Sequence, residues 1–262
     1  MSEQCNRMGR REFLGRAGAA AAGAVLSGAL RPFEGLLAAD DRQADLDKYD
    51  LILPRVKFRC LENVPDDWSI HPIGDVNLLR EFASVARCKI KTQPAGMGRG
   101  SEENFNAVVD FDDFATLSKY PIAFMTAEGH YTFTSGQKAN LKRYISEGGF
   151  LLMDDCVFLM RADYFYQSSF KLLEDVFGMG ATKRIPNSHE VFHNVHDMGD
   201  SGLPHVQGVQ HGARGIFVGD RLGVFLSPSD IHCAWAGHFP NTPPYRPAFK
   251  MGVNILMYAM TH

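Results

Sequence analysis

The chain has 262 residues, of which 45% are hydrophobic and 22% are charged, and its formal net charge at pH 7 is −3. Beyond residue 39 it keeps 22 basic and 27 acidic residues, so the net charge of this part is −5. Such a mildly acidic body argues against nucleic acid as a partner, and its length allows one large domain with a full hydrophobic core.

An export signal is predicted at the N-terminus. Arg10 and Arg11 precede an uncharged, Ala-rich run at 17–30. This order resembles the twin-arginine signal, which directs folded bacterial proteins across the inner membrane. The run is shorter than the ~20 residues of a spanning helix, so a cleaved leader over residues 1–39 is favoured over an uncleaved anchor. We therefore expect a periplasmic or otherwise extracytoplasmic protein, which touches the membrane only through the leader if that is uncleaved.

The leader is expected to be followed by a short linker and a single domain. Cleavage could fall after residue 29 or within 36–39, and the charged, aperiodic residues 40–50 predict the linker. Residues 51–262 then form the domain. It contains an even number of cysteines, which permits two disulfides in an oxidising compartment but leaves their pairing open: Cys60, Cys88, Cys156 and Cys233.

The first part of the domain predicts a strand, a helix and a loop. Residues 56–60 alternate Val and Phe with Lys and Arg, which is typical of an edge strand. Asp75 is expected to cap a helix. Residues 96–106 are polar and rich in glycine, which predicts a surface loop. One face of the helix is apolar: Val76, Leu79, Phe82, Ala83 and Ala86.

The centre of the chain predicts a βαβ unit. Residues 121–126 and 150–153 are short apolar runs that suit buried strands. Between them, Thr134 or Ser135 can cap a helix that Gly148 and Gly149 end, with Leu141, Tyr144 and Ile145 facing inward. A right-handed crossover would make the two strands parallel.

The rest of the chain continues the alternation of helices and strands. Helices are predicted over 165–177 and 248–260, and strands over 216–218 and 221–226 around a Gly-Asp turn. This alternation predicts a three-layer α/β domain with a mostly parallel sheet.

Candidate ligand-binding residues lie in the loops that follow the predicted parallel strands. In such folds ligands gather beyond the carboxyl ends of the strands, here at 127–130, 154–156 and 227–233. Asp154 and Asp155 could bind a cation or a sugar hydroxyl, or cap the following helix, and His130 could be a ligand or a solvated loop residue. The candidates are Glu128, His130, Asp154, Asp155 and Ser227.

The segment 148–156, Gly-Gly-Phe-Leu-Leu-Met-Asp-Asp-Cys, resembles the strand and nucleophile turn of class I glutamine amidotransferases. The resemblance implies a flavodoxin-like, amidotransferase-like fold with Cys156 at the nucleophile position. Asp154 and Phe158, however, replace the glycines of that turn. Ser227 and Ser229 likewise replace the His and Glu of the family's Phe-His-Pro-Glu motif, so glutaminase activity is not expected.

Two interpretations of Cys156 stay open. Asp230 and His232 are close enough in sequence to supply the missing base, which would make Cys156, His232 and Asp230 the catalytic residues of a thiol hydrolase. Alternatively, Cys156 is packed in the core or paired with Cys233, because a cysteine just past a buried strand is more often structural.

From about Tyr49 to His262 the chain also resembles the bacterial domain-of-unknown-function family 4159, whose members are often exported. Three matching segments support this: the strand at 148–156, a Ser-Pro-x-Asp turn at 227–230 and Gly-Val-Asn-Ile at 252–255. The resemblance implies an amidotransferase-like fold and carries no established activity.

A histidine cluster offers a third kind of site. His189-Glu190-Val191-Phe192-His193 matches His-Glu-x-x-His, and His196 follows. In a helix the three histidines would share one face and could bind zinc, with Glu190 as general base of a hydrolase. The glycines and prolines around the segment favour a loop instead.

Taken together, these features predict an exported ligand-binding or interaction module without catalytic activity. Its partner would be a small molecule or an envelope protein. No cofactor is expected, although zinc is possible, and the alternative is one of the two hydrolases described above.

Overall fold

The computed structural model describes residues 46–157 and 162–262, so the predicted leader and most of the predicted linker lie outside the described residues. Strands of the described chain form one sheet in the order β2-β1-β3-β4-β7-β6-β5. The central neighbours are parallel: β2 (Val108–Val109), β1 (Arg55–Val56), β3 (Ile122–Ala127), β4 (Phe150–Asp155) and β7 (Arg221–Ser227). β6 (Arg214–Val218) and β5 (Lys183–Arg184) extend the sheet in antiparallel pairs.

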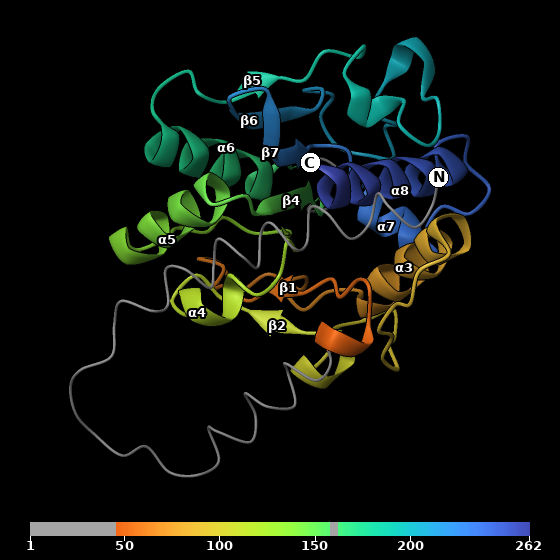
Figure 1. The fold of residues 1–262 in the computed structure, drawn as a ribbon, viewed down its shortest axis with the longest axis horizontal. Helices are drawn as coiled ribbons and strands as arrows, with labels where there is room; N and C mark the ends of the chain where they lie inside the picture. Colours follow the sequence, from red (N-terminus) through yellow and green to blue (C-terminus); the bar gives the residue numbers. More distant parts are fainter. Residues whose placement is uncertain (1–45, 158–161) are drawn as a thin grey trace.

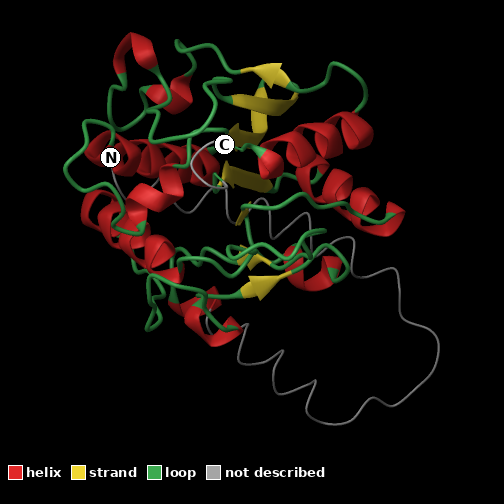
Figure 2. Ribbon diagram, turned by 180° about the vertical axis from the view of Figure 1, so that it is seen from behind, coloured by secondary structure: helices red, strands yellow, loops and turns green. Residues whose placement is uncertain are grey.

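Helices cover both faces of the sheet, which makes three layers (Figures 1 and 2). One layer contains α4 (Phe114–Leu117), α5 (Ser135–Ser146) and α6 (Tyr164–Phe177). The other contains α3 (Pro72–Ala86), α7 (Ile231–Trp235) and α8 (Tyr245–Thr261). Short 3-10 turns lie in the loops: η1 (Glu102–Asn104), η2 (Glu190–Phe192) and η3 (Gly199–Ser201). The predicted α/β class with a mostly parallel sheet is confirmed.

Alternate residues of the central strands supply two hydrophobic cores. In β3, Ala123 and Met125 pack on the side of α5 and α6, whereas Ile122 and Phe124 pack on the side of α3 and α8. Every residue of β3 and β4 is buried, as expected for parallel strands that are covered on both faces. The ends of these two strands are therefore held rigidly.

The predicted βαβ unit is confirmed. β3 and β4 are parallel neighbours, and α5 connects them. Thr134 is the N-cap of α5, and its hydroxyl accepts a hydrogen bond from the Gln137 amide while the Gln137 side chain accepts from Thr134 N. Gly148, at φ 108°, turns the chain from α5 into β4, a conformation that glycine adopts without strain.

Other predicted boundaries are wrong. The edge strand expected at 56–60 is β1, which ends at Val56 and lies inside the sheet, because β2 pairs on its outer side. α3 begins at Pro72, whose fixed φ suits a first helical turn, so Asp75 lies within the helix and caps nothing. None of the described helices is long and apolar enough to cross a membrane.

Candidate functional site

The strand register brings the predicted ligand loops together at the carboxyl edge of the sheet. Ala127 at the end of β3 pairs with Asp155 of β4, and Asp154 pairs with Ser227 at the end of β7. The loops after β3, β4 and β7 therefore leave the sheet side by side. Asp66 joins them from the loop before α3, because its carbonyl accepts a hydrogen bond of 2.8 Å from Glu128 N.

Carboxylates gather at this edge without basic partners. Asp154, Asp155 and Asp230 are fully buried, and none of the three forms an ion pair with a described basic side chain. Burial first, and then neighbouring carboxylates, raise the pKa of Asp154 and Asp155 well above the ordinary value. Burial also raises the pKa of Asp230. The edge therefore carries negative charge only at an energetic cost.

Glu128 is the fourth buried carboxylate of the edge, with 7% of its surface exposed. Burial, together with the nearby Asp66 carboxylate, raises the pKa of Glu128 to about 7. Its Oε2 is buried and has no hydrogen-bond partner in the described part of the chain. An unpaired buried carboxylate oxygen is rare, because leaving it unsatisfied costs free energy.

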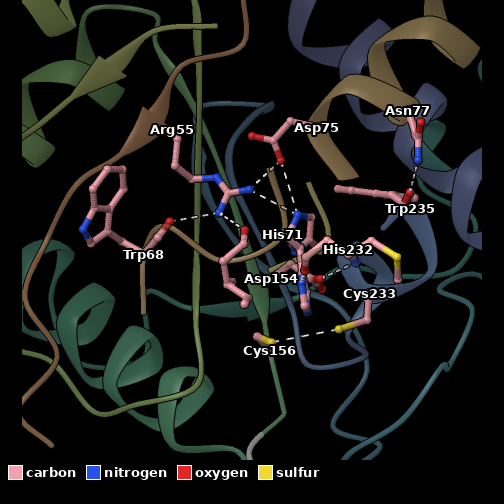
Figure 3. A network of polar contacts seen from close by, with 12 residues as sticks. Arg55, Trp68, His71, Asp75, Asn77, Asp154, Cys156, His232, Cys233 and Trp235 are labelled. Carbon is pink, nitrogen blue, oxygen red and sulfur yellow. Dashed lines mark hydrogen bonds and ion pairs between the residues drawn. The ribbon is translucent and has the colours of Figure 1, made fainter. Parts of the chain in front are cut away.

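Two thiols complete the edge. Cys156 follows β4 directly and Cys233 lies in α7, and their sulfurs are 4.0 Å apart as free cysteines (Figure 3). The hydrogen bond to Cys233, together with burial, raises the pKa of Cys156 well above its ordinary value. Burial raises the pKa of Cys233 to about 12, although the contact with Cys156 opposes this. In the metal-free chain these shifts disfavour the thiolate form of both sulfurs.

Two groups of potential metal ligands share Cys156. Its sulfur, Cys233 Sγ and a carboxylate oxygen of Asp230 lie within 4.8 Å of one another. Cys156 Sγ also lies within 4.8 Å of carboxylate oxygens of Asp66 and Glu128, which are themselves that close. Thiolates and carboxylates are both ligands for transition metals.

His232 belongs to a separate buried network and does not serve Cys156. Its Nε2 lies 3.1 Å from Arg55 Nη2 and 3.3 Å from Asp75 Oδ1 (Figure 3). Burial lowers the pKa of His232 to about 4, so the ring is neutral at pH 7. A Cβ added at Gly74 would lie 2.7 Å from His232 Nε2, which explains a glycine in the first turn of α3.

Arg55 is the centre of this network. Its Nη2 donates to Asp75 Oδ1 at 2.5 Å, and its Nη1 donates to the carbonyls of Trp68 and Ile70 at 2.9 and 3.1 Å. The sequence did not mark Arg55 as a functional residue, and it indicated Asp75 only as a helix cap. An arginine within the apolar run 51–56 was the available signal, because a buried arginine requires a buried partner.

A known family model covers most of the chain. The model of the family described as Domain of unknown function (DUF4159) matches residues 53–260. The chain belongs to this family. A comparison with curated proteins finds no match.

Ser227 and two aspartates of β4 hold the turns at this edge of the DUF4159 domain. Ser227 Oγ accepts a hydrogen bond of 3.2 Å from Ser229 N, which holds the turn after β7. Asp154 Oδ2 accepts from His232 N at 2.8 Å and so orients the start of α7, whereas Asp155 Oδ1 accepts from Tyr166 N at 3.3 Å near the start of α6. Phe158, which the resemblance to amidotransferases singled out, lies outside the described residues.

His130 faces away from the buried carboxylates of the DUF4159 domain. Its Nδ1 is 2.7 Å from Glu62 Oε1, and its ring stacks on Tyr164 with centroids 4.5 Å apart. It lines a surface cavity of about 370 Å³ beside α6. The structure therefore separates His130 from Glu128, although they are two residues apart in the sequence.

The histidine cluster of the DUF4159 domain is not helical in the way that zinc binding would require. Only Glu190–Phe192 forms a 3-10 turn, with His189 as its N-cap and His193 after it. His189 Nδ1 accepts from Val191 N, and His193 binds Asp197 through Nδ1 and the Asn187 carbonyl through Nε2. His196 is held through its backbone amide by Asn254 Oδ1 at 2.8 Å. The three rings do not share one face, and no described group of metal-ligand atoms includes them.

Proposed function

We propose that this domain is an exported, non-catalytic binding protein that holds a cationic ligand at the carboxyl edge of its sheet. The observation that carries the proposal is the set of buried carboxylates, Glu128, Asp154, Asp155 and Asp230, which have no basic partner among the described residues. A bound cation would supply the missing positive charge and offset the cost of burying these groups.

The position of His232, the base that the sequence offers for Cys156, supports binding over thiol catalysis. A thiol hydrolase needs a base within hydrogen-bond reach of its nucleophile, but His232 Nε2 is directed to Arg55 and Asp75. The raised pKa of Cys156 further disfavours the thiolate. The DUF4159 domain would then share an amidotransferase-like, flavodoxin-like architecture without its glutaminase chemistry.

A thermal-unfolding screen tests the proposal. Chelator-treated protein is heated with Ca²⁺, Mg²⁺, Mn²⁺, Zn²⁺, putrescine or spermidine, and with glutamine and neutral sugars as comparisons. We expect at least one cation to raise the Tm, because a ligand that binds only the folded state stabilises it. Glu128→Gln and Asp155→Asn should reduce the rise. Asp220→Asn, in the exposed β6–β7 turn, is the matched control.

Two results would contradict the proposal. One is a Tm that no cation raises. The other is hydrolysis of glutamine that Cys156→Ser abolishes, because that would make the domain a thiol enzyme.

Export by the twin-arginine route is the second part of the proposal, and Arg10 and Arg11 support it. Lysine at both positions should leave the protein in the cytoplasm of a bacterial host, as measured by fractionation and immunoblotting. Unchanged export of the double variant would exclude this route.

A further inference from the structure

We propose that Cys156, Cys233 and Asp230 are ligands of a zinc ion, with Glu128 and Asp66 at its open side. The inference rests on the proposed cation-binding function and names the ion and its ligands. It concerns a different place from the His189 segment, whose histidines have other partners.

The separation of the ligand atoms suits a tetrahedral ion. Two thiolates that each bind Zn²⁺ at about 2.3 Å lie roughly 3.8 Å apart in a tetrahedral site. The Cys156 and Cys233 sulfurs are 4.0 Å apart, and an Asp230 oxygen lies within 4.8 Å of both. Small movements of these side chains would therefore complete the coordination geometry.

Rigid elements hold the three ligands. Cys156 directly follows the central strand β4, and its amide donates to the Ala127 carbonyl of β3 at 3.3 Å. Asp230 is the N-cap of α7 and accepts from Cys233 N at 3.4 Å, which fixes these two ligands relative to each other.

Hydrogen bonds hold the Asp230 carboxylate in one orientation, as they do for carboxylates that bind metals. Its Oδ2 accepts from Val157 N at 3.3 Å and from the Gln207 side chain, whereas Oδ1 accepts from Cys233 N at 3.4 Å. The Cys233 thiol also bonds to this carboxylate, and the lone pair that accepts its proton becomes free when the sulfur is deprotonated. Hydrogen bonds of this kind fix the direction in which a carboxylate presents its free lone pair to a metal.

Glu128 supplies an independent observation that a ligand is bound at this edge. The residue is more than nine-tenths buried, its carboxylate lies within 4.8 Å of Cys156 Sγ, and its Oε2 has no hydrogen-bond partner among the described residues. A cation beside the Cys156 sulfur would satisfy this oxygen. Glu128 or Asp66 could then occupy the fourth position directly or through water.

The mixture of ligand atoms selects the class of ion. Ca²⁺ and Mg²⁺ prefer oxygen ligands only, whereas two sulfurs and a carboxylate suit Zn²⁺. Both thiols are free in the structure, so each sulfur that binds the ion loses its proton to solvent. The thiols release two protons for each Zn²⁺ bound, a carboxyl group that binds the ion releases any proton it carries, and no oxidant or reductant is required.

The test uses the reduced, chelator-treated full chain, with Zn²⁺ or Co²⁺ alone as the probe. Competition with a chromophoric chelator should give one Zn²⁺ per chain. Co²⁺ should produce a thiolate-to-cobalt charge-transfer band in the near ultraviolet. Cys156→Ser and Cys233→Ser should each weaken Zn²⁺ binding by about 100-fold or more, because losing even a group that only hydrogen-bonds to a metal ligand costs about 10–100-fold.

Matched controls separate this site from others. Cys88→Ser removes a half-buried thiol just after α3, and His193→Ala removes the middle histidine of the cluster; both variants should bind Zn²⁺ as the wild type does. If a Cys→Ser variant fails to fold, as judged by circular dichroism, the Co²⁺ spectrum of the wild type decides the question alone.

The outcomes distinguish the two proposals. Cation binding that depends on Glu128 but not on Cys156 and Cys233, or a Co²⁺ complex without the charge-transfer band, would overturn the zinc assignment and leave the proposed function standing. Zn²⁺ binding that only His193→Ala abolishes would also overturn it. No binding of any cation would overturn both.

Discussion

The guanidinium of Arg55 lies fully buried in the sheet, where Asp75 is its charged partner at 2.5 Å. Removing one member of a buried ion pair leaves the other charge unpaired, which costs about 3–5 kcal/mol. Asp75→Leu should therefore destabilise the protein by this amount in urea unfolding. The double variant Arg55→Met/Asp75→Leu should be more stable than Asp75→Leu alone, because no unpaired charge remains.

Lys57 provides the control for this experiment. It is two residues beyond Arg55 and pairs with Glu102 at 2.7 Å, but 51% of its side chain is exposed. Lys57→Met should change the free energy of unfolding by less than about 1 kcal/mol. A double variant that is less stable than Asp75→Leu would show that the hydrogen bonds from Arg55 to Trp68 and Ile70 matter more than its charge.

Residues of the candidate site differ in how far the sequence reveals them. Asp154, Asp155, Cys156 and Ser227 could be placed at one edge because each follows an apolar strand, and parallel strands end together. Arg55 could not be linked to its partner, because Arg55 and His232 are 177 residues apart. No local pattern encodes such a contact.

The capping box at the start of α5 stabilises this helix and, through it, the folded domain. The Thr134 hydroxyl accepts from Gln137 N at 3.2 Å. Thr134→Ala should lower the free energy of unfolding by about 1 kcal/mol, as measured by urea denaturation. Thr132→Ala, at another exposed threonine two residues earlier, is the control. Equal losses in the two variants would contradict a role for the cap.

Elements with strong local signals were predictable, and short ones were not. α5 and β4 were found from a cap, two glycines and an apolar run. β2 and β5 have two residues each, so neither contains a detectable alternation of apolar and polar residues. The shortness of β2 also explains why the sequence predicts β1 to be an edge strand. The sequence does not mark β2, so it cannot reveal that β2 pairs with the outer side of β1.

The acidity of the sheet edge should affect the pH dependence of the whole metal-free molecule. In the folded chain the pKa of Glu128 is about 7, against an ordinary value of 4.5. The folded state therefore holds more protons between these values, and the contribution of Glu128 to stability falls as the pH rises from about 4.5 to about 7. Glu128→Gln removes this dependence.

Urea unfolding of wild type and Glu128→Gln across this range measures the effect. The variant should gain on the order of 2 kcal/mol relative to the wild type by about pH 7. Comparing the two proteins cancels the opposite contribution of His232, whose pKa is lowered. Parallel stability curves would show that Glu128 titrates normally in the folded chain.

The layered α/β architecture could be predicted from the alternation of helices and strands, and the family match over residues 53–260 agrees with the resemblance seen in the sequence. The chemistry at the carboxyl edge of the sheet could not be predicted from the sequence, because burial decides whether a carboxylate or thiol is charged. Asp154 and Asp200 look alike in a sequence, yet one is fully buried and the other exposed.

The Arg55 network also constrains when the domain can finish folding. Arg55 enters the sheet early in the chain, but His232 is made 177 residues later. Contacts of such long range slow folding, and until they form, the buried guanidinium lacks part of its environment. Residue 232 must therefore be synthesised and leave the ribosome before the domain can close. For a protein proposed to cross the membrane already folded, transport of this domain would begin only after that point.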